Sequence, residues 1–166
     1  MEIPYEVGGS VASSAHGVPR TTLDIDIVVE LKPEQIDGVR GGGAANVIHL
    51  KGVWKFDLFP LGRDEYSRTE FAQRKFREIR PDGGAPIEYS VASAEDTILR
   101  KLEWYCAAGE TSDRQWNDLR GVVRAATGTL EIDYLRRWAA HLKIGDLLEK
   151  DPRGAEAYLK LASASD

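Results

Sequence analysis

Hydrophobic and polar residues alternate along the first half of the chain. Between Leu23 and Leu31 every odd-numbered position is apolar, whereas Asp24 and Asp26 fall between them. This period of two predicts a β-strand with its odd-numbered side chains in the core. Similar short runs predict strands over residues 3–7, 46–50, 53–59 and 87–91, a hairpin turn at residues 51–52, and short helices over residues 10–16 and 33–37.

The period of the apolar residues changes after residue 91. Ser93 precedes a run in which Ile98, Leu102 and Tyr105 recur at helical spacing. Ser112 opens a second helical run, whose apolar stripe consists of Trp116, Leu119, Val122, Val123 and Ala126. Residues 132–142, 144–149 and 154–162 also have helical patterns. The pattern predicts an α+β protein, with a small mixed sheet in residues 1–91 followed by a C-terminal helical bundle in residues 92–166.

The composition is typical of a globular protein. Of the 166 residues, 42% are hydrophobic and 30% are charged, and 22 Lys and Arg against 27 Asp and Glu give a net charge of −5. No apolar run approaches the roughly 20 residues that span a bilayer. The N-terminus lacks the basic and apolar regions of a signal peptide, and Cys106 alone cannot form an internal disulfide. We expect a cytoplasmic protein without membrane contact, and without strong non-specific affinity for nucleic acids, because phosphate contacts need clustered Lys and Arg.

Asp24 and Asp26 are the first candidate site residues. Because they are two apart on a predicted strand, their side chains leave the same face, with Cα atoms roughly 7 Å apart. Two carboxylates at that separation repel each other unless a cation, a shared proton or a basic partner lies between them. Their hard oxygens suit Mg²⁺ or Mn²⁺. The simpler alternative is that both side chains point to solvent.

Two further motifs favour a site. Gly8, Gly9 and Ser10 precede a predicted helix, where backbone N–H groups can bind a phosphate, although the same triplet is also typical of a plain turn with a helix cap. Asp57 interrupts an otherwise apolar strand, where a carboxylate needs a partner or a metal. A third carboxylate beside Asp24 and Asp26 would complete a two-metal site.

Together these motifs resemble the signature of the nucleotidyltransferase superfamily, which includes DNA polymerase β. The likeness comprises Val7-Gly8-Gly9-Ser10, thirteen intervening residues, Asp24-Ile25-Asp26-Ile27 and the strand residue Asp57. Residues 8–26 are especially similar to small bacterial nucleotidyltransferase-like proteins, including the toxin enzymes of abortive-infection systems. The resemblance implies a sheet of nucleotidyltransferase type. It also implies transfer of a nucleoside monophosphate from an NTP to a hydroxyl of a protein, an RNA or a small molecule, with release of pyrophosphate.

The resemblance implies a role for each of these residues. Gly9 and Ser10 would hold the β and γ phosphates of the nucleotide. Asp24 and Asp26 would bind two Mg²⁺ or Mn²⁺ ions. Asp57 would bind the catalytic ion and help to deprotonate the acceptor hydroxyl.

A looser likeness to the abortive-infection enzymes covers residues 91–120. By that similarity Lys101 would contact a phosphate, and Asp118 would orient a catalytic or metal-bound group. Arg20 precedes the metal strand and could meet the triphosphate. Each has a simpler interpretation, since Lys101 and Arg20 could be solvated charges and Asp118 could pair with Arg114 four residues earlier.

The remaining reactive or aromatic side chains are expected to be structural. Cys106 falls on an apolar helix stripe and is expected to be buried rather than nucleophilic. The three histidines lack metal-ligand spacing. These histidines are His16, His49 and His141. The four tryptophans, Trp54, Trp104, Trp116 and Trp138, are expected to pack in the core.

Two departures from the family pattern leave other functions open. Family members usually place a helix before the Gly-Ser turn, whereas residues 1–7 precede it here, and the connection over residues 32–45 is short. The protein could therefore be a catalytically inactive nucleotide-binding or partner-binding module, for example one half of a toxin–antitoxin pair. A third interpretation is a nucleic-acid modifier, because six basic and four acidic residues lie between Arg63 and Arg80, interleaved with Tyr66, Phe71 and Phe76.

Overall fold

The computed structural model describes residues 3–32, 45–49, 54–80 and 83–149. The chain divides into two compact units. The first comprises Met1–Val11 and Thr21–Ser93, and the second comprises Ala12–Arg20 and Ala94–Asp166. The sequence pattern placed one boundary between residues 91 and 92. The structure also assigns residues 12–20 to the second unit, so the division falls within helix α1, Gly9–His16.

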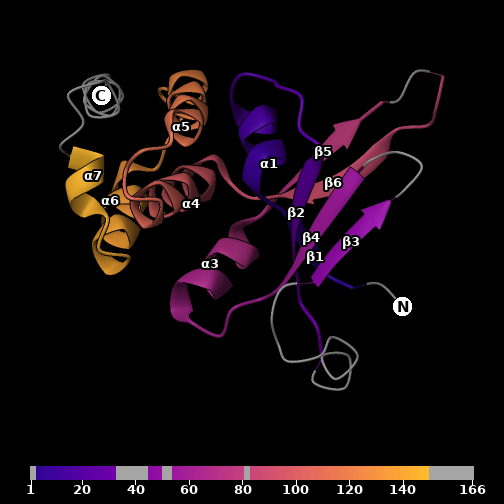
Figure 1. Ribbon diagram of the computed structural model, residues 1–166, viewed down its shortest axis with the longest axis horizontal. Helices are drawn as coiled ribbons and strands as arrows, with labels where there is room; N and C mark the ends of the chain where they lie inside the picture. The colour runs from indigo at the N-terminus through magenta and orange to yellow at the C-terminus, as the bar shows by residue number, and fades with distance from the viewer. Residues whose placement is uncertain (1–2, 33–44, 50–53, 81–82, 150–166) are drawn as a thin grey trace. The chain divides into compact units, whose positions relative to one another are not determined.

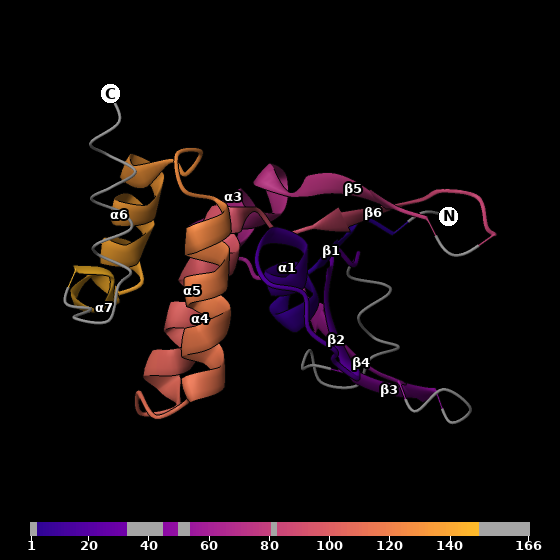
Figure 2. The same cartoon turned by 90° about the horizontal axis from the view of Figure 1, so that it is seen from above.

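The described strands of the first unit form a six-stranded mixed sheet, in the order β3-β4-β2-β1-β6-β5 (Figure 1, Figure 2). β2 runs parallel to β4 and β1 runs parallel to β6, while the other neighbours are antiparallel. This mixed sheet, together with the helices, confirms the predicted α+β class. The strands are β1 (Tyr5–Val7), β2 (Asp24–Val29), β3 (Ala45–His49), β4 (Trp54–Pro60), β5 (Lys75–Ile79) and β6 (Ile87–Val91).

The alternation predicted around residues 23–31 produces strand β2, but its apolar face is only half-buried. Ile25, Ile27 and Val29 lie on the face opposite Asp24 and Asp26. No residue of β2 is fully buried, so the expectation that this apolar face lies in the core is wrong. The buried apolar residues of the first unit come from other elements, namely Val7, Tyr66, Phe71, Val91 and Ala92.

Residues 64–79 contain two elements that the sequence pattern did not predict. Helix α3, Glu65–Gln73, begins after Asp64, whose Oδ1 accepts a hydrogen bond from the Ser67 N–H at 2.8 Å. Strand β5 follows, and all of its residues are exposed. A strand with two solvent-accessible faces has no need of apolar alternation, so a search for a period of two cannot detect it.

The second unit consists of helices. Ser112 caps α5 as predicted, since its Oγ accepts a hydrogen bond from the Gln115 N–H at 3.4 Å. Four residues of the predicted stripe of α5, Trp116, Leu119, Val122 and Val123, are buried as expected, whereas Ala126 caps the helix and is half-buried. The helices that follow the sheet are α4 (Ala94–Ala107), α5 (Asp113–Ala125), α6 (Ile132–His141) and α7 (Gly145–Glu149).

Three side chains expected in the core are exposed instead. Trp54 and Trp104 are 41% and 59% exposed, and Cys106 is also exposed. In the last turn of α4 the buried side chain is Tyr105, which lies between Trp104 and Cys106 in the sequence. Its sequence neighbours are each rotated by about 100° around the helix axis and so point away from the core. Trp116 and Trp138 are buried as expected.

Some predicted segments lie outside the described residues. They are the helix over residues 33–37, the turn at residues 51–52, most of the connection over residues 32–45, and the helix over residues 154–162. Within the part of the chain that the structure describes, no helix is both long enough and apolar enough to cross a membrane.

Candidate functional site

Four charged side chains lie on one face of the sheet in the first unit. In the parallel pair of β2 and β4, Asp24 lies opposite Lys55 and Asp26 lies opposite Asp57. Residues two apart on a strand share a face, and so do directly paired residues on neighbouring strands. All four side chains therefore leave the same face, and we call its three aspartates, Asp24, Asp26 and Asp57, the carboxylate cluster. Their roles as metal ligands stay a prediction.

Lys55 forms an ion pair within this group of charges. Its Nζ lies 2.7 Å from Asp57 Oδ2, and the side chains of Lys55 and Asp57 are 39% and 14% exposed. The hydrogen bond to Asp57 is the main reason why the pKa of Lys55 is raised, and the negative charges of Asp57, Asp24 and Asp26 add to it. The other oxygen of Asp57, Oδ1, is buried and has no hydrogen-bond partner. Lys55 is thus a basic partner of Asp57, one of the alternatives to a metal that the sequence left open.

The glycine turn approaches the carboxylate cluster closely. The Gly8 N–H donates a hydrogen bond to the backbone carbonyl of Asp26 at 2.9 Å. Gly9 has a φ of +57°, and a Cβ atom there would overlap Asp26 Oδ2 and lie 2.7 Å from its Cγ. Only glycine fits this position, because the backbone is left-handed and has no room for a side chain. The turn therefore starts helix α1 directly beside the Asp26 carboxylate.

The carboxylate cluster has donors of the chemistry that Mg²⁺ and Mn²⁺ prefer. The orphaned Oδ1 of Asp57 and the ion pair with Lys55 both show that this face attracts a cation. Among the described residues, however, no three His, Cys, Asp or Glu side chains are gathered as a set of metal ligands. The donor chemistry fits a divalent cation, but the side chains must move before all three aspartates can hold one.

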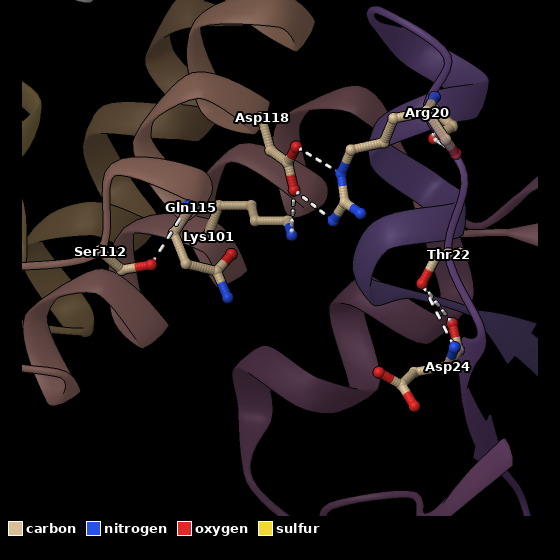
Figure 3. A network of polar contacts seen from close by, with 8 residues as sticks. Arg20, Thr22, Asp24, Lys101, Ser112, Gln115 and Asp118 are labelled. Atoms are coloured by element: carbon tan, nitrogen blue, oxygen red, sulfur yellow. Dashed lines mark hydrogen bonds and ion pairs between the residues drawn. The ribbon is translucent and has the colours of Figure 1, made fainter.

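The second unit holds a different polar network, in which one carboxylate lies between two cations (Figure 3). Asp118 on α5 accepts two hydrogen bonds from Arg20, at 2.8 Å from Nε to Oδ1 and at 2.9 Å from Nη2 to Oδ2. Lys101 on α4 donates to the same Oδ2 from its Nζ at 3.0 Å. The side chains of Asp118 and Lys101 are 8% and 6% exposed, so this contact lies largely out of water.

Electrostatics in this network keep Asp118 ionised. Burial by itself raises the pKa of Asp118, because it disfavours the charged carboxylate. The hydrogen bonds and charges of Arg20 and Lys101 outweigh burial, so the pKa of Asp118 lies below its ordinary value. The hydrogen bond to Asp118 correspondingly raises the pKa of Arg20. The alternative of Arg114 as the partner of Asp118 is wrong, since Arg114 is exposed and both carboxylate oxygens are already bonded to Arg20 and Lys101.

The position of Arg20 depends on a close backbone approach. Ser14 Oγ accepts a hydrogen bond from the Arg20 N–H at 3.3 Å. A Cβ atom on Gly17 would lie 2.8 Å from the Gly121 carbonyl carbon and the Val122 nitrogen of α5. The segment between α1 and Arg20 can therefore lie against α5 only because residue 17 has no side chain.

Comparison with known proteins identifies the fold through structure and not through sequence. No protein-family model matches the sequence, and a search of curated proteins finds no match. By structure the chain is similar to an antigenic nucleotidyltransferase-like protein from Paracoccidioides brasiliensis, with a TM-score of 0.56 and 14% sequence identity. The alignment covers 96% of this chain and 85% of that one. The chain has a nucleotidyltransferase-like fold.

Within this nucleotidyltransferase-like fold, sequence reasoning gave no role to two residues of the polar groups described above. Lys55 lies two positions before Asp57, so the same period of two that placed Asp57 also places Lys55 on its face. Tyr134 donates a hydrogen bond from its hydroxyl to Asp96 Oδ1 at 2.7 Å and so joins α6 to the buried start of α4. Local sequence carries no signal for this second contact, because 38 positions separate the two residues.

Proposed function

We propose that the chain is a metal-dependent nucleotidyltransferase that moves a nucleoside monophosphate from an NTP to a hydroxyl of a protein, an RNA or a small molecule and releases pyrophosphate. The observation that carries the proposal is the close approach of Gly9 to the Asp26 carboxylate. A triphosphate bound at the start of α1 would lie beside the carboxylate cluster. The nucleotidyltransferase-like fold supports the same proposal.

The proposal gives each residue of the first unit a task. Gly9 and Ser10, at the positive end of α1, hold the β and γ phosphates. Asp24 and Asp26 hold two Mg²⁺ or Mn²⁺ ions and Asp57 holds the catalytic one; these ions supply neutralisation of the phosphoryl charge. Asp57 also helps to take the proton from the acceptor hydroxyl. The hydroxyl oxygen then attacks the α-phosphorus, and the bond from that phosphorus to pyrophosphate breaks.

Residues of the second unit do not carry this proposal. Arg20, Lys101 and Asp118 bond to one another, so the carboxylate of Asp118 has partners without any bound triphosphate. Contacts of Lys101 and Arg20 with the triphosphate, and an orienting role for Asp118, stay predictions. Catalysis is proposed for the first unit, where the glycine turn lies beside Asp26 of the carboxylate cluster.

A transfer assay tests the proposed function. The full chain is incubated with MgCl₂, each of the four NTPs labelled at the α-phosphate, and a cell lysate as the source of acceptors. We expect label to enter a macromolecule or small molecule in the wild type and not in the Asp24→Asn, Asp26→Asn double variant. Glu88→Gln is the matched control, because Glu88 is an exposed strand carboxylate outside the cluster. Equal labelling by the wild type and the double variant would rule out the proposal.

One observation favours a second candidate, the catalytically inactive binding module. Asp57 is already neutralised by Lys55, and the described residues contain no ready set of three metal ligands. Such a module would bind a triphosphate, or a partner protein such as the other half of a toxin–antitoxin pair, without transfer. Calorimetric binding of an NTP without release of pyrophosphate would identify its nucleotide-binding form.

The structure gives less support to the nucleic-acid modifier. Two of the three aromatic residues between Arg63 and Arg80, Tyr66 and Phe71, are buried in the first unit, and only Phe76 is exposed. Buried rings cannot stack on bases. The basic residues of this stretch therefore lack the aromatic platform that the sequence pattern suggested.

A further inference from the structure

We propose that the ammonium group of Lys55 is a built-in counter-ion of the carboxylate cluster, which a divalent cation must displace from Asp57 in order to bind. The inference rests on the proposed function, because it concerns the cation that the function requires. It adds a regulatory property of the site, namely that the chain's own lysine competes with the metal.

The placement of Lys55 is the first argument. Lys55 lies opposite Asp24 in the register of β2 and β4, and two positions before Asp57 on the same strand. Its side chain therefore leaves the sheet among the aspartates, on the face where a metal would bind. The 2.7 Å contact joins it to Oδ2 of Asp57, the carboxylate that the proposed function assigns to the catalytic ion.

The occupancy of the Asp57 oxygens is the second argument. Oδ2 is bonded to Lys55, and Oδ1 is buried without a hydrogen-bond partner. A carboxylate so placed gains from a cation that reaches both oxygens, which one ammonium does not do. A divalent ion on Asp57 would also repel an ammonium group a few ångströms away, since like charges in a partly dry site interact strongly. The two cations are therefore alternatives.

The side chain of Lys55 is suited to leaving. It is 39% exposed, and a lysine has a flexible four-carbon stem with a strongly hydrated head. The ammonium can move into water while its backbone stays paired in β4.

Titration with Mn²⁺ alone tests the inference without measuring activity. Free Mn²⁺ is followed by electron paramagnetic resonance as the full-length wild type, Lys55→Met or Lys55→Arg is added. Met keeps the length of the side chain but removes its charge, whereas Arg keeps the charge. We expect Lys55→Met to bind Mn²⁺ about two- to fivefold more tightly than the wild type, the range expected from loss of a partly exposed ion pair. Lys55→Arg should stay within about twofold of the wild type.

The outcomes separate the inference from the proposed function. Binding that is lost in the Asp24→Asn, Asp26→Asn variant locates the ion at the carboxylate cluster. If the wild type binds there and Lys55→Met binds with the same or lower affinity, Lys55 is no competitor and the inference is overturned, while the proposed function stands. If only Lys55→Met binds, the inference is supported in its strongest form. If no variant binds Mn²⁺, the inference is overturned, whereas the proposed function is decided by the transfer assay, in which the triphosphate supplies further metal ligands. Thermal unfolding of each variant shows that it is folded.

Discussion

Arg20 and Asp118 form a two-point ion pair although 98 positions separate them in the chain. The paired geometry fixes the guanidinium against both carboxylate oxygens, and Lys101 completes the network. Because Asp118 is largely buried, removal of its charge takes a shared carboxylate away from two cations. Such losses are among the costlier single substitutions in proteins.

Replacement of Asp118 by Asn should destabilise the chain in a pH-dependent way. At pH 7 we expect the free energy of unfolding to fall by about 2–3 kcal/mol. The pKa of Asp118 is lowered in the folded state, so its contribution is present above the ordinary value near pH 4 and is lost as the pH falls through the folded pKa. Urea unfolding at pH 7, 5 and 3, monitored by tryptophan fluorescence, measures the free energy of unfolding of both proteins. The difference between wild type and variant should shrink at pH 3.

The control for this experiment is Asp113→Asn. Asp113 lies exposed in the first turn of the same helix, where its charge contributes at most about 1 kcal/mol through the helix dipole. A difference for Asp118→Asn that is no larger than that for the control, or that persists unchanged at pH 3, would contradict the role given to the ion pair.

Gly9 and Gly8 should respond differently to the same substitution. Gly9→Ala places a side chain on a left-handed backbone and against the Asp26 carboxylate, so we expect a loss of about 1–3 kcal/mol in stability and loss of Mn²⁺ binding. Gly8→Ala meets no atom within 4 Å and should leave both nearly unchanged. Chemical denaturation and Mn²⁺ titration of the two variants provide the comparison. Similar behaviour of both variants would mean that the close approach of Gly9 is unimportant.

Gly17 and Gly121 offer a second matched pair. A methyl group on Gly17 would press on the backbone of α5 at 2.8 Å, and we expect Gly17→Ala to cost about 1–3 kcal/mol. Gly121 lies inside α5 with 3.4 Å to its nearest neighbour, so Gly121→Ala should be neutral or stabilise by up to about 1 kcal/mol through helix propensity. In thermal unfolding, the midpoint of Gly17→Ala should lie below that of the wild type, and the midpoint of Gly121→Ala should equal or exceed it. A stable Gly17→Ala variant would disprove the contact.

Tyr134 should contribute to stability through its hydroxyl group. Tyr134→Phe removes the 2.7 Å hydrogen bond to the fully buried Asp96 and should lower the free energy of unfolding by about 1–2 kcal/mol. Tyr89→Phe is the control, because Tyr89 is half-buried on β6 and its hydroxyl has no hydrogen bond to any described residue. Urea unfolding of both variants measures the difference, and equal effects would show that the bond contributes little.

Helix α5 shows which parts of the fold the sequence could predict. Its cap at Ser112 and its stripe from Trp116 to Val123 are both encoded within a few residues, so local spacing was sufficient. Strand β5 shows the opposite. Its residues are exposed on both faces and it exists through its pairing with β6, which local spacing does not contain.

The candidate site divides in the same way. Asp24 and Asp26 could be placed on one face from their spacing alone. That Asp57 stands beside Asp26 depends on the register of β2 and β4, and that Asp118 bonds to Arg20 depends on tertiary packing. Lys55 was overlooked because a search for metal ligands selects acids and passes over the base that neutralises them.

The six residues of strand β2 include two sets of side chains on opposite faces of the sheet. Asp24 and Asp26 are the proposed metal ligands, while Ile25, Ile27 and Val29 are half-buried on the opposite face. A systematic scan of single substitutions should therefore give two interleaved profiles, one visible in ligand binding and one in solubility and expression. Substitution of the aspartates would leave the apolar residues unchanged. The proposed catalysis could therefore be lost or gained in evolution without a change in the sheet.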